Sequence, residues 1–223
     1  MFKFINKDSN QVISLIETIF AVLTVAACLT GSKMVDIAIG NSHVYTPASA
    51  FCFILTFFLS NVISHLAGEA EAKACIARGL ISQIIATALF FLVGLLPAQY
   101  SEVQESYMQI LGTSWILVVA SLSAFVISQS LQVTLFELMK AKLSVGLSNF
   151  FSVLVSQIFD TSIFTVIAFG LGQKMLFNSA GLSMLVHIFV TQYAIKMIVS
   201  IAFSPLVTLI LKKAEVNFNS NLN

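Results

Sequence analysis

Long apolar runs separated by short polar breaks dominate this chain. Each is at least as long as the roughly 20 residues that an α-helix needs to cross the hydrocarbon core of a bilayer. The runs lack the strict alternation of a barrel strand, and a helix satisfies its own backbone groups in lipid. The pattern predicts an all-α, polytopic membrane helix bundle that forms a single domain over residues 1–223, with about six transmembrane helices at 11–31, 46–67, 75–97, 109–139, 145–170 and 180–211.

Composition agrees with the pattern and excludes several classes of protein. Hydrophobic residues make up 58% of the chain and charged residues 9%, whereas soluble domains carry about 25% charged residues. This excludes a soluble globular enzyme, and six spans leave no room for a soluble catalytic domain. The net charge of +1 also argues against nucleic acid as a partner, because no basic surface is available to neutralise phosphates.

Basic residues predict the orientation of the bundle. If both termini are cytoplasmic, only Lys33 and Lys174 fall outside, while Lys196 lies within a span. Short cytoplasmic loops are enriched in Lys and Arg, so this orientation is favoured. Between 97 and 112 the outer loop has the character of a short interfacial helix. The basic residues expected inside are Lys3, Lys7, Lys73, Arg78, Lys140, Lys142, Lys212 and Lys213.

The three cysteines indicate neither a disulfide framework nor a zinc site. Cys28, Cys52 and Cys75 are odd in number, lie in or beside apolar runs and have no CxxC spacing. The run that ends at Cys28 is similar to a lipoprotein signal, but the rest of the chain is polytopic, so we expect the first helix to stay uncut.

Two ionisable residues lie near the centres of predicted spans. Placing Asp160 or Lys196 at mid-membrane costs about 2.5–3.5 kcal/mol on insertion scales, so each needs a partner, water or a function. The helical repeat of 3.6 places Asp160 on a polar stripe with Asn149, Ser152, Ser156 and Gln157. It places Lys196 on one face with Gln192, Tyr193 and Ser200.

Two interpretations of this pair stay open. In one, Asp160 and Lys196 neutralise each other and hold two helices together. In the other, they form part of a site for a solute or ion, because intramembrane ionisable groups are commonly functional. The two are compatible if the pair opens when a ligand arrives.

Other polar residues are weaker candidates. Gln129 and Gln132 form an i, i+3 pair in the fourth span, and Glu17 lies about two turns into the first. His65 and Glu69 lack the further ligands that a metal needs, so we expect no metal site. The sequence contains no catalytic motif such as GxSxG, HExxH or GxxxxGK[ST]. These observations predict a carrier rather than an enzyme, with no cofactor.

Several motifs resemble the YhhQ family of queuosine precursor transporters, also called the vitamin uptake transporter family. The most specific is Ser156-Gln157-Ile158-Phe159-Asp160-Thr161-Ser162-Ile163-Phe164. Others are Ser121-Leu122-Ser123-Ala124-Phe125 with Ser128-Gln129, Tyr193-Ala194-Ile195-Lys196 followed by Pro205, and, more locally, Lys33, Thr46-Pro47 and Ala77-Arg78. Compared with the family pattern, Asn61 and His65 replace an Asp and a Glu, and Gln132 replaces an Asp.

The resemblance implies a multi-pass carrier in a bacterial inner (plasma) membrane for 7-deazaguanines such as preQ0, preQ1 or queuine, salvaged for tRNA modification. For a nucleobase-like substrate we expect Asp160 and Gln157 to bind the N–H donors and Lys196 the carbonyl, with Phe125 and Phe164 on the ring faces. The other candidate substrate-binding residues are Gln129, Gln132, Tyr193, Asn149 and Glu17.

Alternatives within and outside transport remain. The chain could be the substrate-binding membrane subunit of a vitamin uptake system that borrows an ATPase, which co-purification would reveal. It could instead be a non-transport membrane protein in which Asp160 and Lys196 are purely structural. Neither homo-oligomerisation nor an ATPase-containing complex is specified by the sequence.

Overall fold

The computed structural model describes residues 9–31, 33–39, 42–112, 115–172, 174–177 and 179–220. The elements are α1 (Ser9–Thr30), β1 (Met34–Ile39), β2 (Ser42–Pro47), α2 (Ser49–Ala67), α3 (Glu69–Gly94), α4 (Ser101–Leu111), α5 (Trp115–Lys140), α6 (Val145–Thr165), the π-helix η2 (Val166–Leu171), the 3-10 turn η3 (Met175–Phe177) and α7 (Ser179–Ser220).

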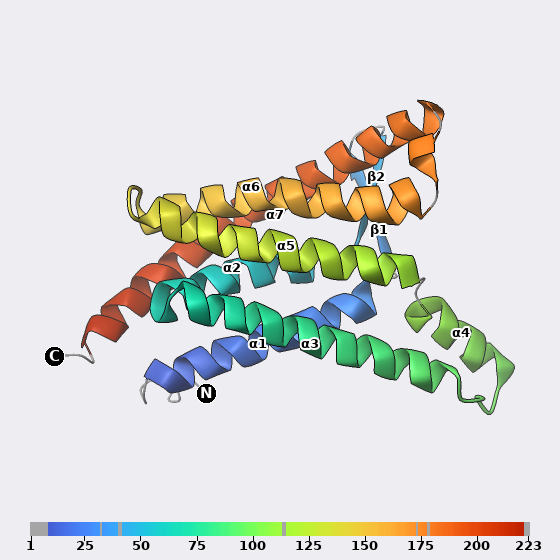
Figure 1. Ribbon diagram of the computed structural model, residues 1–223, viewed down its shortest axis with the longest axis horizontal. Coiled ribbons are helices and arrows are strands. Elements are labelled where there is room, and N and C mark those ends of the chain that lie inside the picture. The colour runs from blue at the N-terminus through green and yellow to red at the C-terminus, as the bar shows by residue number, and fades with distance from the viewer. Residues whose placement is uncertain are drawn as a thin grey trace.

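The predicted helix bundle is confirmed. Within the described residues, six helical segments are long and apolar enough to cross a membrane. The start of α1 and the end of α7 lie at one end of the bundle, here called the terminal end, together with the α2–α3 and α5–α6 turns (Figure 1). The β-strands, α4 and the turn between α6 and α7 lie at the opposite end, here called the hairpin end. Which end faces the cytoplasm stays a prediction.

A β-hairpin follows α1, where the sequence pattern predicted only a loop and the start of a helix. Strands β1 and β2 pair antiparallel, from Met34 opposite Pro47 to Ile39 opposite Ser42. Residues 46 and 47, which were expected in the second span, therefore belong to β2, and α2 begins at Ser49. Proline fixes φ and lacks an N–H, so Pro47 suits a strand end better than a helix interior.

The predicted short helix before the fourth span is confirmed as α4. Its Gln104 Nε2 donates to the carbonyl of Gly94 at 2.7 Å, and Tyr107 Oη donates to the carbonyl of Phe90 at 3.0 Å. The first bond satisfies a carbonyl at the last residue of α3, which has no partner within that helix, and both bonds hold α4 against the end of α3. Residues 109–111, expected in the fourth span, belong to α4, and the long helix begins at Trp115.

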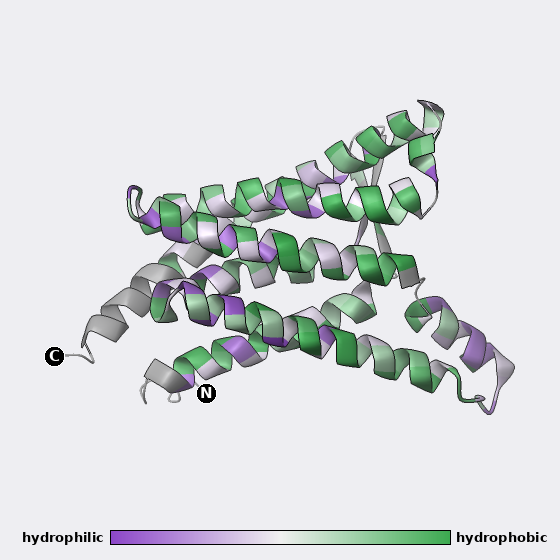
Figure 2. Ribbon diagram, in the orientation of Figure 1, coloured by the Kyte–Doolittle hydropathy of each residue, from purple (hydrophilic) through white to green (hydrophobic). Residues whose placement is uncertain are grey.

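The bundle is apolar on its outer surface and contains many buried polar side chains. Figure 2 shows hydrophobic residues predominating along α3 and α5 and hydrophilic ones along α4. Many large apolar side chains are exposed, such as Ile85, Leu89 and Leu138, as expected for a surface that faces lipid. Buried polar side chains gather instead on α2, α5 and α6, which places the candidate chemistry in the interior.

Helices α1 and α3 approach closely near their middles. A Cβ atom on Gly79 would lie 2.6 Å from Cε1 of Phe20, which is fully buried. Thr24 Oγ1 donates to the carbonyl of Gly79 at 3.4 Å. The glycine thus allows a contact that a larger residue would prevent.

Candidate functional site

Asp160 and Lys196 form an ion pair between α6 and α7. Lys196 Nζ lies 2.5 Å from Asp160 Oδ2, and the two side chains are only 9% and 11% exposed, respectively. Ser128, on α5, donates to Asp160 Oδ1 at 3.1 Å, and Lys196 Nζ donates to Thr161 Oγ1 at 3.2 Å. Three helices therefore meet at one carboxylate, and the hydroxyl groups offset part of the desolvation cost of the charges.

Local sequence explains how α6 and α7 carry these residues. Ser144 caps the start of α6, where its hydroxyl accepts from the backbone N–H of Leu147 at 3.4 Å. The helix widens into the π-helix η2 after Thr165, five residues beyond Asp160. Short π-helical segments are frequent at functional sites. On α7, Pro205 lies nine residues beyond Lys196 and removes one backbone donor from the helix.

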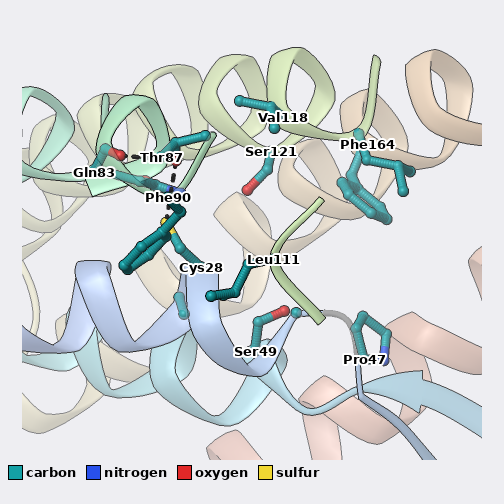
Figure 3. A pocket seen from close by; sticks show the side chains of 13 residues that line it. Cys28, Pro47, Ser49, Gln83, Thr87, Phe90, Leu111, Val118, Ser121 and Phe164 are labelled. Atoms are coloured by element: carbon teal, nitrogen blue, oxygen red, sulfur yellow. Dashed lines mark hydrogen bonds between the residues drawn. The ribbon is translucent and has the colours of Figure 1, made fainter. Parts of the chain in front are cut away.

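A two-part cavity reaches the ion pair. The ion-pair chamber encloses about 380 Å³ of space including its open mouth, and Asp160, Lys196, Gln192 and Phe164 are in its wall. The α1–α3 chamber encloses about 660 Å³ measured the same way, and Cys28, Gly31, Gln83, Thr87 and Phe90 are in its wall. Both chambers share four lining residues, which are Pro47, Ser49, Ser121 and Phe164 (Figure 3).

The cavity lies towards the hairpin end. Its wall includes Gly31 after α1, Pro47 at the end of β2, Leu111 of α4 and Leu117 in the first turn of α5. All four belong to segments at the hairpin end of the bundle (Figure 1). A solute could therefore approach the ion pair from that end without crossing the full thickness of the bundle.

Gln129 and Gln132 belong to a hydrogen-bond network between α5 and α2. Gln129 Nε2 donates to Thr56 Oγ1 at 2.6 Å, and Gln132 Nε2 donates to the backbone carbonyl of Phe57 at 2.8 Å and to Asn61 Oδ1. The Ser60 hydroxyl lies 3.0 Å from Oε1 of each glutamine. These two predicted site residues are held by α2 and do not line either chamber.

The network continues to α6 through Asn61. Its Nδ2 donates to Asn149 Oδ1 at 2.8 Å and to Ser152 Oγ at 3.1 Å. Asn149 lies eleven residues before Asp160, about 16 Å along the helix towards the terminal end. We call Thr56, Ser60, Asn61, Gln129, Gln132, Asn149 and Ser152 the amide network, and it separates the cavity from the terminal end.

Gln157 is buried beside the ion pair without a hydrogen-bond partner. Its side chain is 1% exposed, and neither Oε1 nor Nε2 has a partner among the described residues. It precedes Asp160 by three positions, so the two occupy neighbouring places on α6. A buried amide that loses its hydrogen bonds costs about 1–3 kcal/mol, so this residue carries a cost that a ligand or a second conformation can remove.

The predicted aromatic residues occupy different places. Phe164 lies in the wall of both chambers, edge-on to Phe169 with ring centroids 6.0 Å apart. Phe125 is 1% exposed and packs in the core, 6.1 Å from the Phe20 ring and 5.9 Å from that of Phe53. Of these two residues, Phe164 is the one in the cavity wall, where it can contact a bound ring.

Tyr193 braces α7 against α6 rather than lining a chamber. Its hydroxyl donates to the carbonyl of Leu154 at 3.4 Å. Its ring stacks on that of Phe189, with centroids 6.0 Å apart and parallel planes. The stacking lies within α7, and the hydrogen bond links α7 to α6 one turn before Lys196.

Glu17 lies apart from the other candidates. Its carboxylate pairs with Arg78 at 2.5 Å, and Arg78 also contacts Glu71 at 2.6 Å. This cluster joins α1 to the first half of α3 near the terminal end. His65 lies edge-on to Phe136 with centroids 6.4 Å apart.

Sequence reasoning missed several cavity residues. Gln83 is in the wall of the α1–α3 chamber, and Ser49 and Ser121 also line the cavity. Gln192, which helical spacing placed on one face with Lys196 but which was not among the candidate site residues, lines the ion-pair chamber. Gln83 carries a detectable signal, because it is the long polar side chain at the middle of an apolar span. The serines carry none, since serine is ordinary in membrane helices.

Comparison with known proteins decides the family. The sequence profile of a family described as "Putative vitamin uptake transporter" matches residues 47–210, which is well over half of the chain. The chain belongs to this family. The part of the chain that matches the vitamin uptake transporter family includes every predicted site residue except Glu17. With six membrane-spanning helices among the described residues, the chain is a multi-pass membrane protein.

One curated relative is also similar. A protein of Bacillus subtilis (strain 168) named "Probable queuosine precursor transporter" is 31% identical over 156 residues, which cover 67% of this chain and 64% of the relative. The chain therefore spans less than two thirds of the length of that relative. No solved structure matches this member of the vitamin uptake transporter family.

Proposed function

We propose that this chain is a transporter that imports a queuosine precursor, a 7-deazaguanine base, across a bacterial inner membrane for salvage into tRNA modification. The observation that carries the proposal is a buried Asp160–Lys196 pair in the wall of a cavity between helices. The family, and a relative named for queuosine precursor transport, support the choice of substrate class.

The chemistry of the pair suits a guanine-like edge. Such a base presents two adjacent N–H donors beside a carbonyl. A carboxylate has about four acceptor positions, and the Asp160 oxygens use one each for Ser128 and Lys196. Asp160 can therefore accept the two N–H groups while Lys196 donates to the carbonyl, and charge-assisted bonds of this kind are about twice as strong as neutral ones.

Two neighbours complete the binding site in this proposal. Phe164 provides a ring face in the wall of both chambers, and stacking of a base on an aromatic side chain is worth about 1–3 kcal/mol. Gln157 gains the hydrogen bonds that it lacks in the free protein when α6 turns its amide towards the bound base. Substrate binding then removes the cost of an unpaired buried amide.

Transport requires the site to open alternately at each end of the bundle. The cavity reaches segments at the hairpin end, while the amide network lies between the ion pair and the terminal end. In the predicted orientation this arrangement faces outwards. Opening the other side then requires α2 to separate from α5 and α6, and water can satisfy the amide and hydroxyl groups that become exposed.

The test is restoration of queuosine in the tRNA of a bacterium that lacks its own precursor transporter. Cells expressing this chain are fed preQ0, preQ1 or queuine separately, and queuosine in tRNA is measured. We expect restoration by at least one base with the wild-type chain, and loss of restoration with Asp160→Asn. Glu102→Gln, which changes an exposed carboxylate on α4, is the control and should restore queuosine as the wild-type chain does.

Two results would overturn the proposal. One is no restoration by any of the three bases when immunodetection shows the protein in the membrane. The other is wild-type uptake and affinity in the Asp160→Asn variant, which would remove the carboxylate from the binding site.

A further inference from the structure

The α1–α3 chamber has a polar patch of its own, distinct from the ion pair. Gln83, Thr87 and Phe90 recur at spacings of four and three along α3, so they share one helical face, and all three are in the chamber wall. Cys28 of α1 lies opposite, with its Sγ 3.6 Å from Thr87 Oγ1 (Figure 3). Thr87 also donates to the backbone carbonyl of Gln83 at 2.9 Å.

Gln83 is the member of this patch with unused hydrogen-bonding capacity. Its side chain is 3% exposed, and its Oε1 has no hydrogen-bond partner among the described residues. One turn earlier, Gly79 packs directly against Phe20, whereas from Gln83 onwards the same face of α3 borders the cavity. Gln83 therefore lies at the base of this chamber, one turn beyond the close packing of α1 on α3.

The wall of the chamber also restricts the charge of a ligand. The described residues that line it include apolar side chains, serines, Thr87, Cys28 and Gln83, and none of them is charged. An ammonium group placed there would lose water without gaining a carboxylate, which is unfavourable. A neutral donor such as a hydroxyl group would instead give Gln83 Oε1 the partner that it lacks.

We propose that the α1–α3 chamber is a second subsite of the transport cavity, which accepts a neutral, hydroxyl-bearing side arm attached to the transported base. The base binds at the Asp160–Lys196 pair, the arm passes the shared residues Ser49, Ser121 and Phe164, and Gln83 accepts its hydrogen bond. This inference rests on the proposed function and adds to it the class of substituent that the protein prefers.

Matched ligands test the subsite on the purified, full-length protein. The probes are unsubstituted 7-deazaguanine and three derivatives that carry a butyl, a 3-hydroxypropyl or a 3-aminopropyl chain at position 7. Binding is measured by calorimetry. A neutral hydrogen bond contributes about 0.5–1.5 kcal/mol, so we expect the hydroxypropyl base to bind about 2- to 10-fold more tightly than the butyl base, and the aminopropyl base more weakly than either.

Variants locate the effect at one atom. Gln83→Met keeps the length of the side chain and removes its acceptor, and should abolish the advantage of the hydroxypropyl base while leaving the affinity for unsubstituted 7-deazaguanine unchanged. Thr87→Val is the matched control and should keep the advantage of the hydroxypropyl base, because the Thr87 hydroxyl already donates to a backbone carbonyl. The comparison of arms on wild-type protein needs no variant, so the test survives if Gln83→Met does not fold.

Cys28 gives an independent readout of occupancy. It is half-buried in the chamber wall, and Cys52 and Cys75, which do not line it, are replaced by alanine. The hydroxypropyl base should slow the reaction of Cys28 with a maleimide, while unsubstituted 7-deazaguanine should not.

The outcomes separate this inference from the proposed function. Equal affinities of the butyl and hydroxypropyl bases, or unchanged labelling of Cys28 with the hydroxypropyl base bound, would overturn the subsite and leave the proposed function standing. If none of the four bases binds the wild-type protein, the proposed function fails and the subsite fails with it.

Discussion

Replacing either member of the Asp160–Lys196 pair with a neutral residue leaves the other as an unpaired charge inside the bundle. In Asp160→Asn, Lys196 keeps only Thr161 as a partner, and in Lys196→Gln, Asp160 keeps only Ser128. Removing one partner of a buried ion pair costs about 3–5 kcal/mol. Both side chains remain about one tenth exposed and line a cavity, so we expect the lower value for each variant.

The double variant Asp160→Asn/Lys196→Gln separates stability from transport. It contains no unpaired charge, and the two amides can bond to each other, so we expect its free energy of unfolding to return to within about 1 kcal/mol of wild type. A loss of about 3 kcal/mol in each single variant is roughly a 150-fold change in the folding equilibrium. Uptake should be lost in all three variants, because none retains the pair that binds the base.

Two measurements on the same proteins check this prediction. Unfolding by sodium dodecyl sulfate in mixed micelles, followed by circular dichroism, gives the free energies, and uptake of the base into cells gives the activity. If the losses of the single variants simply add in the double variant, the residues do not interact in the membrane. If the double variant transports like wild type, the pair is only structural, and the proposed binding site is wrong.

Three further substitutions test separate parts of the structure. Gln157→Leu removes an unpaired buried amide, so the free energy of unfolding should not fall below that of wild type, while uptake should fall at least tenfold. Unchanged uptake would exclude Gln157 from the site. Gly79→Ala should lower the free energy of unfolding by about 1–3 kcal/mol, because the new methyl group meets the Phe20 ring. The loss should be smaller in a Phe20→Leu background, and equal losses in both backgrounds would contradict the close contact. A cysteine introduced at Lys142 should react with an impermeant thiol reagent only in inverted vesicles, and one introduced at Lys174 only in intact cells. The opposite pattern would reverse the predicted orientation.

Strong energetic penalties made part of the candidate site predictable. A charge in the middle of an apolar run is costly, so Asp160 and Lys196 were identifiable from their positions alone, and the structure places them in contact. Helical spacing also placed Gln157 beside Asp160. The penalty for an intramembrane charge is what makes such a pair visible in a single sequence.

Helix neighbours were not predictable in the same way. Gln129 and Gln132 were recognised as polar residues on one helical face, but periodicity does not reveal which helix that face contacts. Their partners Ser60 and Asn61 lie about 70 positions away on α2. Phe125 was predicted to lie on a ring face of the substrate, and the structure packs it against Phe20; from sequence alone, an aromatic side chain looks alike in a core and in a binding site.

The hairpin has a local sequence signal that differs from the long apolar runs. Val35, Ile37 and Ile39 alternate with other residues, and Gly40-Asn41 connects two such stretches, a combination typical of a two-residue hairpin loop. Residues 40 and 41 lie outside the described part of the chain, but the register of Ile39 opposite Ser42 leaves two residues between the strands. Six residues per strand are too few to stand out against spans of about 20.

The amide network described above has an electrical consequence. Its members are Thr, Ser, Asn and Gln, none of which is ionised, and the ion pair next to it has no net charge. Each elementary charge that moves through a membrane potential of 100 mV changes the free energy by about 2.3 kcal/mol. In the proposed transport cycle the helices part along this network while Asp160 and Lys196 move together, so no net charge crosses the field. With a neutral base we therefore expect equal uptake in energised and in depolarised cells.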